Sequence, residues 1–289
     1  MRDVIIIGKG PAGISAALYI KRAGLDVLVI GKDYGALGTA DKIDNYYGFE
    51  RTISGKELVE NGIKQAERLG VEILNQEVVS IAKNERFEVK TPENTYEANL
   101  VLLATGKKRT GINIPGFERF KGKGISFCAI CDGFFFRGKK LALIGSGDYA
   151  AAELEELRRF TEDITVFTNQ MPITTDKFES GLKIVTDKIL SINGQDRVEK
   201  ITTDKGEYPV DGVFVAIGTA SAADFATKIG VLTDNDKIIV DSNYMTNLEG
   251  LYAAGDAIGG LSQIAKAVAD GALAAVDIIK KAKILKKGK

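Results

Sequence analysis

The chain has 289 residues, of which 45% are hydrophobic and 27% charged, and its formal net charge is zero. This length suits two domains, and the composition is that of an ordinary globular protein and not of a disordered one. The balanced charge gives no indication of nucleic-acid binding, and no stretch has the length of apolar sequence that a membrane helix needs.

Histidine is absent and cysteine occurs only twice. A chain without histidine cannot form a Ser-His-Asp triad, a Cys-His pair or a histidine-ligated metal site. Two cysteines supply only half of a thiolate shell for zinc, so we expect no metal site. Proton transfer must then use a carboxylate, a thiol, a tyrosine, a lysine or water.

The amino-terminal segment has the pattern of a strand, a glycine loop, a helix and a second strand. Its parts are an apolar run at 4–7, the glycines Gly8, Gly10 and Gly13, a helix to about Arg22 and a strand at 27–30. This βαβ unit is typical of dinucleotide binding, because its glycines permit a tight turn, close approach to a diphosphate and close helix packing. The helix amino terminus then faces the phosphates.

The apolar run at the amino terminus enters the glycine loop after a few residues, and no cleavage-site pattern follows. It is therefore not typical of a signal peptide, and we expect a cytoplasmic protein. Thiols are kept reduced there, which favours a catalytic role for a cysteine pair.

An apolar strand at 100–106 is followed by the segment "SFCAICDGFFF" at 126–136, which contains both cysteines. Cys128 and Cys131 could form a metal site, a structural disulfide, two small buried apolar residues or a redox pair. A Cys-x-x-Cys pair can hold one sulfur as a reactive thiolate, and Asp132 is the adjacent proton donor. We favour the redox pair.

Positive charge is concentrated in two places. Residues 106–140 carry nine Lys or Arg against Glu118 and Asp132, and the last ten residues add six lysines and no acid. Such charge either forms a solvated surface with a frayed terminus or attracts an acidic partner.

A second glycine pattern follows the first after 137 residues. It has a strand at 141–144, the small residues Gly145, Gly147 and Ala150, a helix and a strand at 164–168. The pattern fits a second dinucleotide-binding domain, or else a plain parallel sheet with glycine turns. Another apolar strand follows at 212–218.

The carboxyl-terminal part has a strand within 247–260 that ends at Gly255 and Asp256. A helix of small residues is predicted from Leu261 to about Lys283. An aspartate at this position suits the binding of a ribityl or ribose hydroxyl near a phosphate.

These motifs resemble the low-molecular-weight, FAD-containing thioredoxin reductases over nearly the whole chain. The matching segments are "GKGPAG", "KIDNYYGF" at 42–49, "ATG" at 104–106, "CAICDG" at 128–133, "GSGDYA" at 145–150 and "AGDA" followed by "SQIAKAVADGALAA" at 262–275. The resemblance implies an α/β fold with two Rossmann-like, doubly wound domains, the second inserted into the first. The FAD domain would comprise 1–108 and 239–289, and 109–238 would carry the cysteines on a degenerate pyridine-nucleotide fold. It also implies a homodimer.

The resemblance further implies roles for individual residues. Cys128 and Cys131 would be the redox pair, and Asp132 the acid that protonates a leaving thiolate or the reduced flavin. At the FAD diphosphate the resemblance places Gly8, Gly10, Pro11, Ala12 and Gly13, and near the adenosine ribose it places Asp33. Asn45 would lie near the flavin, Gly255 with Asp256 on the ribityl chain, and Gln263, Ile264 and Ala265 at the isoalloxazine. Ala104, Thr105 and Gly106 would also belong to the FAD site. Gly31 stands where an acidic residue usually holds that ribose.

The chain departs from NADPH-using members in its second glycine motif. Those members read close to GGGDSA there, and their next strand ends in an HRR-type cluster that binds the 2′-phosphate. Here Ser146 and Tyr149 interrupt the motif, and the strand ends "TVFTNQMPITTDKF", without an arginine. Arginine normally meets a 2′-phosphate, so we do not expect NADPH. NADH would require an acidic residue at that strand end, which is also missing.

In lacking these nucleotide-binding residues, the chain resembles the ferredoxin-dependent flavin thioredoxin reductases of anaerobic bacteria. That resemblance implies thioredoxin as substrate and reduced ferredoxin as electron donor. Ferredoxins are generally acidic, so the basic residues of 106–140 would attract them. Alternatives are an NADPH- or NADH-dependent thioredoxin reductase, a flavoprotein acting on a small-molecule disulfide, a ferredoxin–NADP reductase and a binding module without activity. The last two would not need the cysteine pair.

Overall fold

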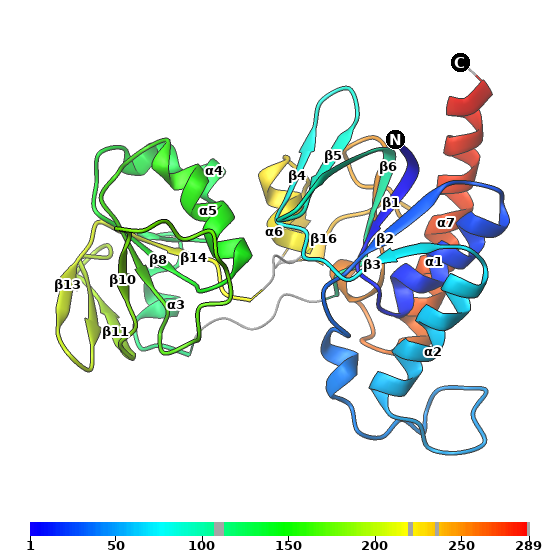
Figure 1. Ribbon diagram of the computed structural model, residues 1–289, viewed down its shortest axis with the longest axis horizontal. Coiled ribbons are helices and arrows are strands. Elements are labelled where there is room, and N and C mark those ends of the chain that lie inside the picture. The colour runs from blue at the N-terminus through cyan, green and yellow to red at the C-terminus, as the bar shows by residue number, and fades with distance from the viewer. Residues whose placement is uncertain (107–112, 219–221, 235–236, 288–289) are drawn as a thin grey trace. The chain divides into compact units, whose positions relative to one another are not determined.

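The computed structural model describes residues 1–106, 113–218, 222–234 and 237–287 (Figure 1). The chain divides into two compact units, one formed by Met1–Lys108 with Ser221–Lys289 and the other by Arg109–Ala220. Each unit is built around a largely parallel sheet. This confirms the expected fold class of two Rossmann-like domains.

The sheet of the first unit has the strand order β3-β2-β1-β6-β5-β4, and β17 also pairs with β6. The strands are β1 (Arg2–Ile7), β2 (Val27–Ile30), β3 (Glu72–Leu74), β4 (Ser80–Lys83), β5 (Phe87–Lys90), β6 (Thr95–Leu103) and β17 (Leu251–Ala253). All pairs are parallel except β4–β5 and β5–β6, and β4 and β5 form the cyan hairpin of Figure 1. Strand β2 reads VLVI and is buried throughout, as a central parallel strand covered on both faces should be.

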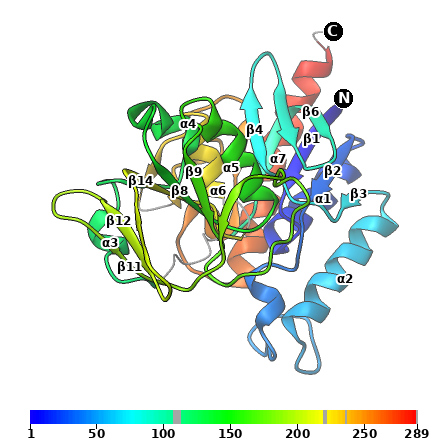
Figure 2. The same cartoon turned by 60° about the vertical axis from the view of Figure 1, so that its left-hand side comes forward.

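Two helices of the first unit, α1 and α7, pack directly against each other (Figure 2). The helical elements of this unit are α1 (Pro11–Arg22), α2 (Gly55–Arg68), α6 (Ala222–Lys228), α7 (Ile264–Lys287), η1 (Ala36–Thr39) and η3 (Gly255–Ile258). The two helices reach backbone contact at Gly271, where an added Cβ would lie 2.0 Å from the carbonyl oxygen of Ala12. Only glycine permits that separation.

Helix α7 begins three residues later and ends four residues later than the sequence predicts. Its start is delayed because the Gln263 N–H bonds to the carbonyl of Leu261 in a turn that precedes the helix. Its lysines are not frayed: Lys286 pairs with Asp3 at 2.6 Å and Lys281 with Glu249 at 2.7 Å. Within the described ranges, no helix is long and apolar enough to cross a membrane.

The second unit has a parallel sheet and a smaller antiparallel one. The parallel sheet, in the order β10-β9-β8-β14-β7, contains β7 (Ile125–Ser126), β8 (Leu141–Ile144), β9 (Ile164–Phe167), β10 (Lys183–Val185) and β14 (Gly212–Val215). The antiparallel sheet contains β11 (Ile189–Asn193), β12 (Lys200–Thr203) and β13 (Glu207–Pro209). The helical elements are α3 (Phe117–Phe120), α4 (Ala129–Asp132), η2 (Gly133–Phe136) and α5 (Asp148–Arg158).

The chain returns to the first unit at Ser221, earlier than the expected boundary at 239. Helix α6 packs against β4, and the short hairpin of β15 (Thr233–Asp234) and β16 (Lys237–Ile238) packs against α6 and η3. The apolar face of α6, including the buried Phe225, therefore belongs to the first unit. Neither this helix nor its packing on the sheet of the first unit is predicted from the sequence.

The contact at Gly271 gives a stability prediction. We expect G271A to lower the free energy of unfolding by about 2–4 kcal/mol, because a Cβ would force α1 and α7 apart at backbone atoms. The matched control is G62A in the interior of α2, where the new Cβ would lie 3.4 Å from Ile14 Cγ2. That variant should be neutral or gain up to about 1 kcal/mol from helix propensity. Urea unfolding followed by circular dichroism measures both, and equal effects would contradict the packing argument.

Candidate active site

The glycine loop after β1 forms a cradle of backbone atoms. Gly8 has a φ of +113°, and a Cβ there would lie 2.3 Å from the carbonyl oxygen of Ala104. A Cβ on Gly13 would lie 1.9 Å from the oxygen of Gly8. Helix α1 starts at Pro11 after Gly10, and no side chain in the described structure caps it. Its first-turn N–H groups are therefore available to a diphosphate.

The loop that carries Gly255 and Asp256 is held against this cradle by an ion pair that sequence reasoning missed. Lys266 bonds to Asp270 at 2.7 Å and to the carbonyls of Gly255 and Gly259 at 3.0 and 2.6 Å. Asp270 in turn accepts the Gly255 N–H at 3.1 Å. The only signal in the sequence is the i,i+4 spacing of Lys266 and Asp270, which usually indicates a surface pair.

Asn45 and Gln263, both expected near the flavin, lie next to each other, and Thr105, also expected at the FAD site, has a buried hydroxyl. Asn45 Nδ2 donates to Gln263 Oε1 at 3.1 Å, and both side chains are exposed. Ile264 and Ala265 form the first turn of α7, directly after Gln263. The hydroxyl of Thr105 is buried, and no described residue hydrogen-bonds to it. A buried hydroxyl without a partner at this position fits a site completed by a ligand.

The region expected to hold the adenosine ribose contains a buried lysine. The Lys9 side chain lies over Gly31, where a Cβ would be 2.9 Å from Lys9 Cγ, and its ammonium donates to Asn75 Oδ1. Burial lowers the pKa of Lys9. Asp33 accepts the N–H of Gly35 at 2.8 Å, within its own loop. Lys9, which follows β1, and Asn75, which follows β3, therefore meet beside Gly31 at the end of β2.

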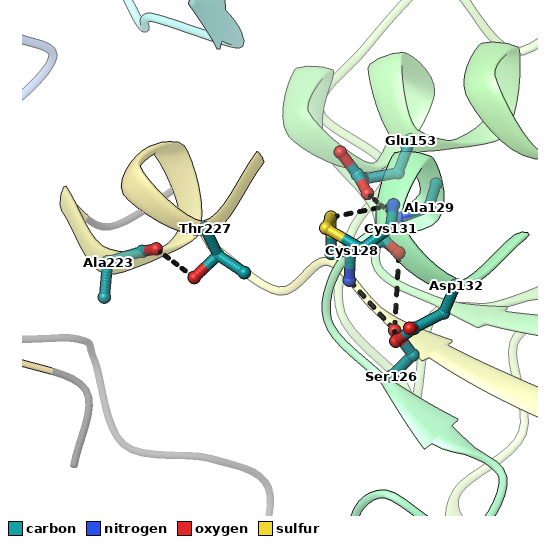
Figure 3. Close-up of a disulfide and its surroundings, with 8 residues drawn as sticks. All are labelled: Ser126, Cys128, Ala129, Cys131, Asp132, Glu153, Ala223 and Thr227. Carbon is teal, nitrogen blue, oxygen red and sulfur yellow. Dashed lines mark hydrogen bonds between the residues drawn. A yellow bond between two sulfur atoms is a disulfide. The ribbon is translucent and has the colours of Figure 1, made fainter. Parts of the chain in front are cut away.

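The two cysteines form a disulfide at the start of α4, with Cα atoms 5.3 Å apart (Figure 3). Cys128 is buried and Cys131 is exposed. The Ser126 hydroxyl accepts the Cys128 N–H at 3.1 Å and donates to Asp132 Oδ2 at 2.6 Å. A second backbone bond joins the Cys131 N–H to Cys128 Sγ at 3.2 Å. The structure thus brings together all three residues of the expected redox site and adds Ser126.

A buried carboxylate on α5 also contacts the redox turn. Glu153 Oε2 accepts the N–H of Ala129, the residue after Cys128, at 3.0 Å. Glu153 is 2% exposed. An acid in a helix is normally expected to face solvent, so nothing in the sequence places this one beside the disulfide.

The second glycine loop, between β8 and α5, is covered by the chain that follows β9. The Thr174 N–H donates to the carbonyl of Ser146 at 2.9 Å, and the Thr175 hydroxyl donates to Asp148 at 2.8 Å. A Cβ on Gly147 would lie 3.1 Å from Thr174 Oγ1. The segment at 171–176, here called the covering loop, thus contacts the amino terminus of α5, the part of a Rossmann-like fold that can bind a diphosphate.

Comparison with known proteins agrees with this architecture. The pyridine nucleotide-disulphide oxidoreductase family matches residues 2–271. A thioredoxin reductase of Listeria monocytogenes is 31% identical over 94% of this chain and 91% of its own. The atypical thioredoxin reductase TRi of Desulfovibrio vulgaris has a TM-score of 0.92 and 36% identity, with 98% of each chain covered. A ferredoxin-flavin thioredoxin reductase of Clostridium acetobutylicum has a TM-score of 0.72 and 33% identity, with 97% of each chain covered.

The Ser126 hydroxyl gives a local prediction. S126A removes the acceptor of the Cys128 N–H and a donor to Asp132. The free energy of unfolding should fall by about 1–3 kcal/mol, because the buried Cys128 N–H is left unpaired. Hydrogen–deuterium exchange of the oxidised protein should then be faster in residues 124–134. The control is S191A, which removes a hydroxyl bonded to Asn193 in the same unit. Unchanged exchange at 124–134 in S126A would refute the role given to this hydroxyl.

Proposed function

The chain belongs to the pyridine nucleotide-disulphide oxidoreductase family and, within it, to the thioredoxin reductases, and on that basis we propose that it reduces thioredoxin with electrons taken from reduced ferredoxin through FAD. The observation that carries the proposal is the Cys128–Cys131 disulfide held beside Asp132. The enzyme class follows from family membership, whereas the electron donor is part of the proposal.

The residues of the first unit fit FAD. The backbone cradle at Gly8 and Gly13 and the free amino terminus of α1 would hold the diphosphate, and Asp256 the ribityl hydroxyls. The Thr105 hydroxyl would gain the partner that it lacks among the described residues. When bound, FAD supplies both one-electron and two-electron redox chemistry, which is what links an iron–sulfur donor to a disulfide.

The chemistry at the cysteines follows from thiol–disulfide exchange. Two electrons and two protons convert the Cys128–Cys131 disulfide into two thiols. A thiolate of the pair then attacks the thioredoxin disulfide, and the other cysteine resolves the mixed disulfide and releases reduced thioredoxin. As a carboxylate, Asp132 accepts the hydrogen bond of Ser126, and as an acid it donates a proton to the leaving thiolate.

Exposed apolar residues beside the disulfide support a protein substrate. Phe134 and Phe135 are 63% and 70% exposed, and Ile130, between the cysteines, is also exposed. Exposed aromatic residues are unfavourable in water, and such clusters often mark protein-binding surfaces. A small-molecule disulfide would not need them.

Two features support ferredoxin over a pyridine nucleotide as the electron donor. The covering loop contacts Ser146 and Asp148 at the second glycine motif, and Thr168, Asn169 and Gln170 offer no arginine to a 2′-phosphate. The second unit also carries exposed basic residues, namely Arg119, Lys121, Lys123, Arg137 and Lys140. Such a surface would speed the approach of an acidic protein.

The donor can be tested by anaerobic reduction of the purified yellow protein. We expect reduced ferredoxin, freed of excess reductant, to bleach the flavin and then to support reduction of thioredoxin, because the nucleotide site is covered. NADPH and NADH in separate cuvettes should leave the flavin oxidised. Fast bleaching by either nucleotide would overturn the donor assignment and indicate a pyridine-nucleotide thioredoxin reductase.

A variant with reversed charge tests whether the basic surface of the second unit guides ferredoxin. In K121E/K123E, reduction by ferredoxin should be slower and should depend less on salt, since complementary charge accelerates encounter. The control K188E reverses an exposed lysine elsewhere in the second unit. Equal rates in both variants would show that this surface does not guide ferredoxin.

The proposal includes a homodimer formed through the first unit. Helices α1 and α7, which pack against each other, carry exposed apolar residues, among them Tyr19, Leu273 and Val276. Exposed apolar side chains on two adjacent helices favour association with a second copy of the chain.

The dimer predicts a mass twice the 31.1 kDa of the chain. L273E should reduce the mass toward that of the monomer, because it would bury a charge in an apolar interface. The control L232E alters an exposed leucine outside α1 and α7 and should remain dimeric. Light scattering during size-exclusion chromatography measures both, and a monomeric wild type would refute the dimer.

A further inference from the structure

Glu153 has a buried carboxylate that takes no part in the proposed mechanism. It projects from α5 toward the redox turn, on the opposite side of the turn from Ser126 and Asp132 (Figure 3). Its Oε2 bonds to the N–H of Ala129, so it contacts the main chain between the two cysteines. Acidic side chains therefore contact the turn from two sides. Glu153 bonds to its main chain directly, and Asp132 is linked to it through the Ser126 hydroxyl.

A carboxylate is an unusual choice for this position. The other buried residues of α5 are Tyr149, Ala150, Ala151, Leu154 and Leu157, and none of them is charged at neutral pH. An amide side chain would accept the same N–H without the cost of burying a charge. The negative charge is therefore the property that distinguishes Glu153 from an amide at this position.

The described elements that carry or adjoin the disulfide differ in the charged and titratable groups that they contribute. Helix α4 carries Asp132, and the buried face of α5 carries Glu153 and Tyr149. The neighbouring η2 has only Gly and Phe, and β7 has only Ile125 and Ser126. Among these groups, the negative charges nearest the cysteines are the two carboxylates.

We propose that Glu153 is a positioning residue whose negative charge opposes formation of a thiolate in the reduced pair and so makes that pair a stronger reductant. The inference rests on the proposed redox role of Cys128 and Cys131. The Cys131 N–H, 3.2 Å from Cys128 Sγ, favours negative charge on that sulfur, and Glu153 opposes it. Because a thiolate stabilises the reduced state, a group that disfavours it shifts the equilibrium toward the disulfide. A disulfide reductase benefits, since its electrons must pass on to thioredoxin.

The variant E153Q separates charge from hydrogen bonding, because its amide oxygen can still accept the Ala129 N–H. After reduction with dithiothreitol, the pair should react with iodoacetamide at a lower pH in E153Q than in the wild type. In a dithiothreitol redox buffer above neutral pH, the equilibrium should shift toward the dithiol by about 3- to 10-fold, which is the effect of one nearby charge. The control E155Q changes the exposed glutamate two residues along α5 and should match the wild type.

If E153Q does not fold, E153M replaces the acid with an apolar side chain of similar length. It should shift the iodoacetamide reaction and the dithiothreitol equilibrium in the same direction as E153Q. Wild-type behaviour in the folded variant, or a shift toward the disulfide, would overturn the inference. These measurements use holoenzyme reduced by dithiothreitol and need neither ferredoxin nor thioredoxin. Failure of the wild type to reduce thioredoxin would therefore refute the proposed function and leave the role of Glu153 to be judged separately.

Discussion

The contact of Gly271 with the main chain of Ala12 is the constraint on which the first unit depends. Because there is no side chain at this point of α7, the start of α1 can approach it to backbone contact. Asp270, the preceding residue of α7, accepts the N–H of Gly255 and pairs with Lys266. The glycine loop, η3 and the start of α7 thus form one packed group, although they come from opposite ends of the chain.

The redox turn is organised differently, by a small number of buried polar atoms. The backbone N–H groups of Cys128 and Ala129 are each held by a side chain, Ser126 on one side and Glu153 on the other. Satisfied polar networks of low exposure fix geometry more strictly than apolar packing does. In a chain without histidine, this arrangement places the carboxylates of Asp132 and Glu153 beside the disulfide.

The two glycine loops have similar sequences and reach different structures. After β1, the amino terminus of α1 remains open, and the nearby strand ends carry Lys9 and Asn75. After β8, the covering loop bonds to Ser146 and Asp148 and contacts Gly147. The spacing of the glycines therefore predicts the backbone of each loop, but not which segment of the chain contacts it.

The sequence by itself determined the fold class, because two βαβ patterns with glycines at fixed spacing, such as Gly8 to Gly13, admit few other structures. It also indicated that Cys128 and Cys131 lie close together, since their spacing is local and survives any arrangement of the rest, and the structure joins them in a disulfide. Only the tertiary structure decided that Ser126 and Glu153 hold that pair, that Lys266 and Asp270 secure the loop at Gly255, and that α6 joins the first unit. These contacts join residues far apart in the chain or placed by helix rotation, and the burial of each polar group depends on neighbours that periodicity cannot identify.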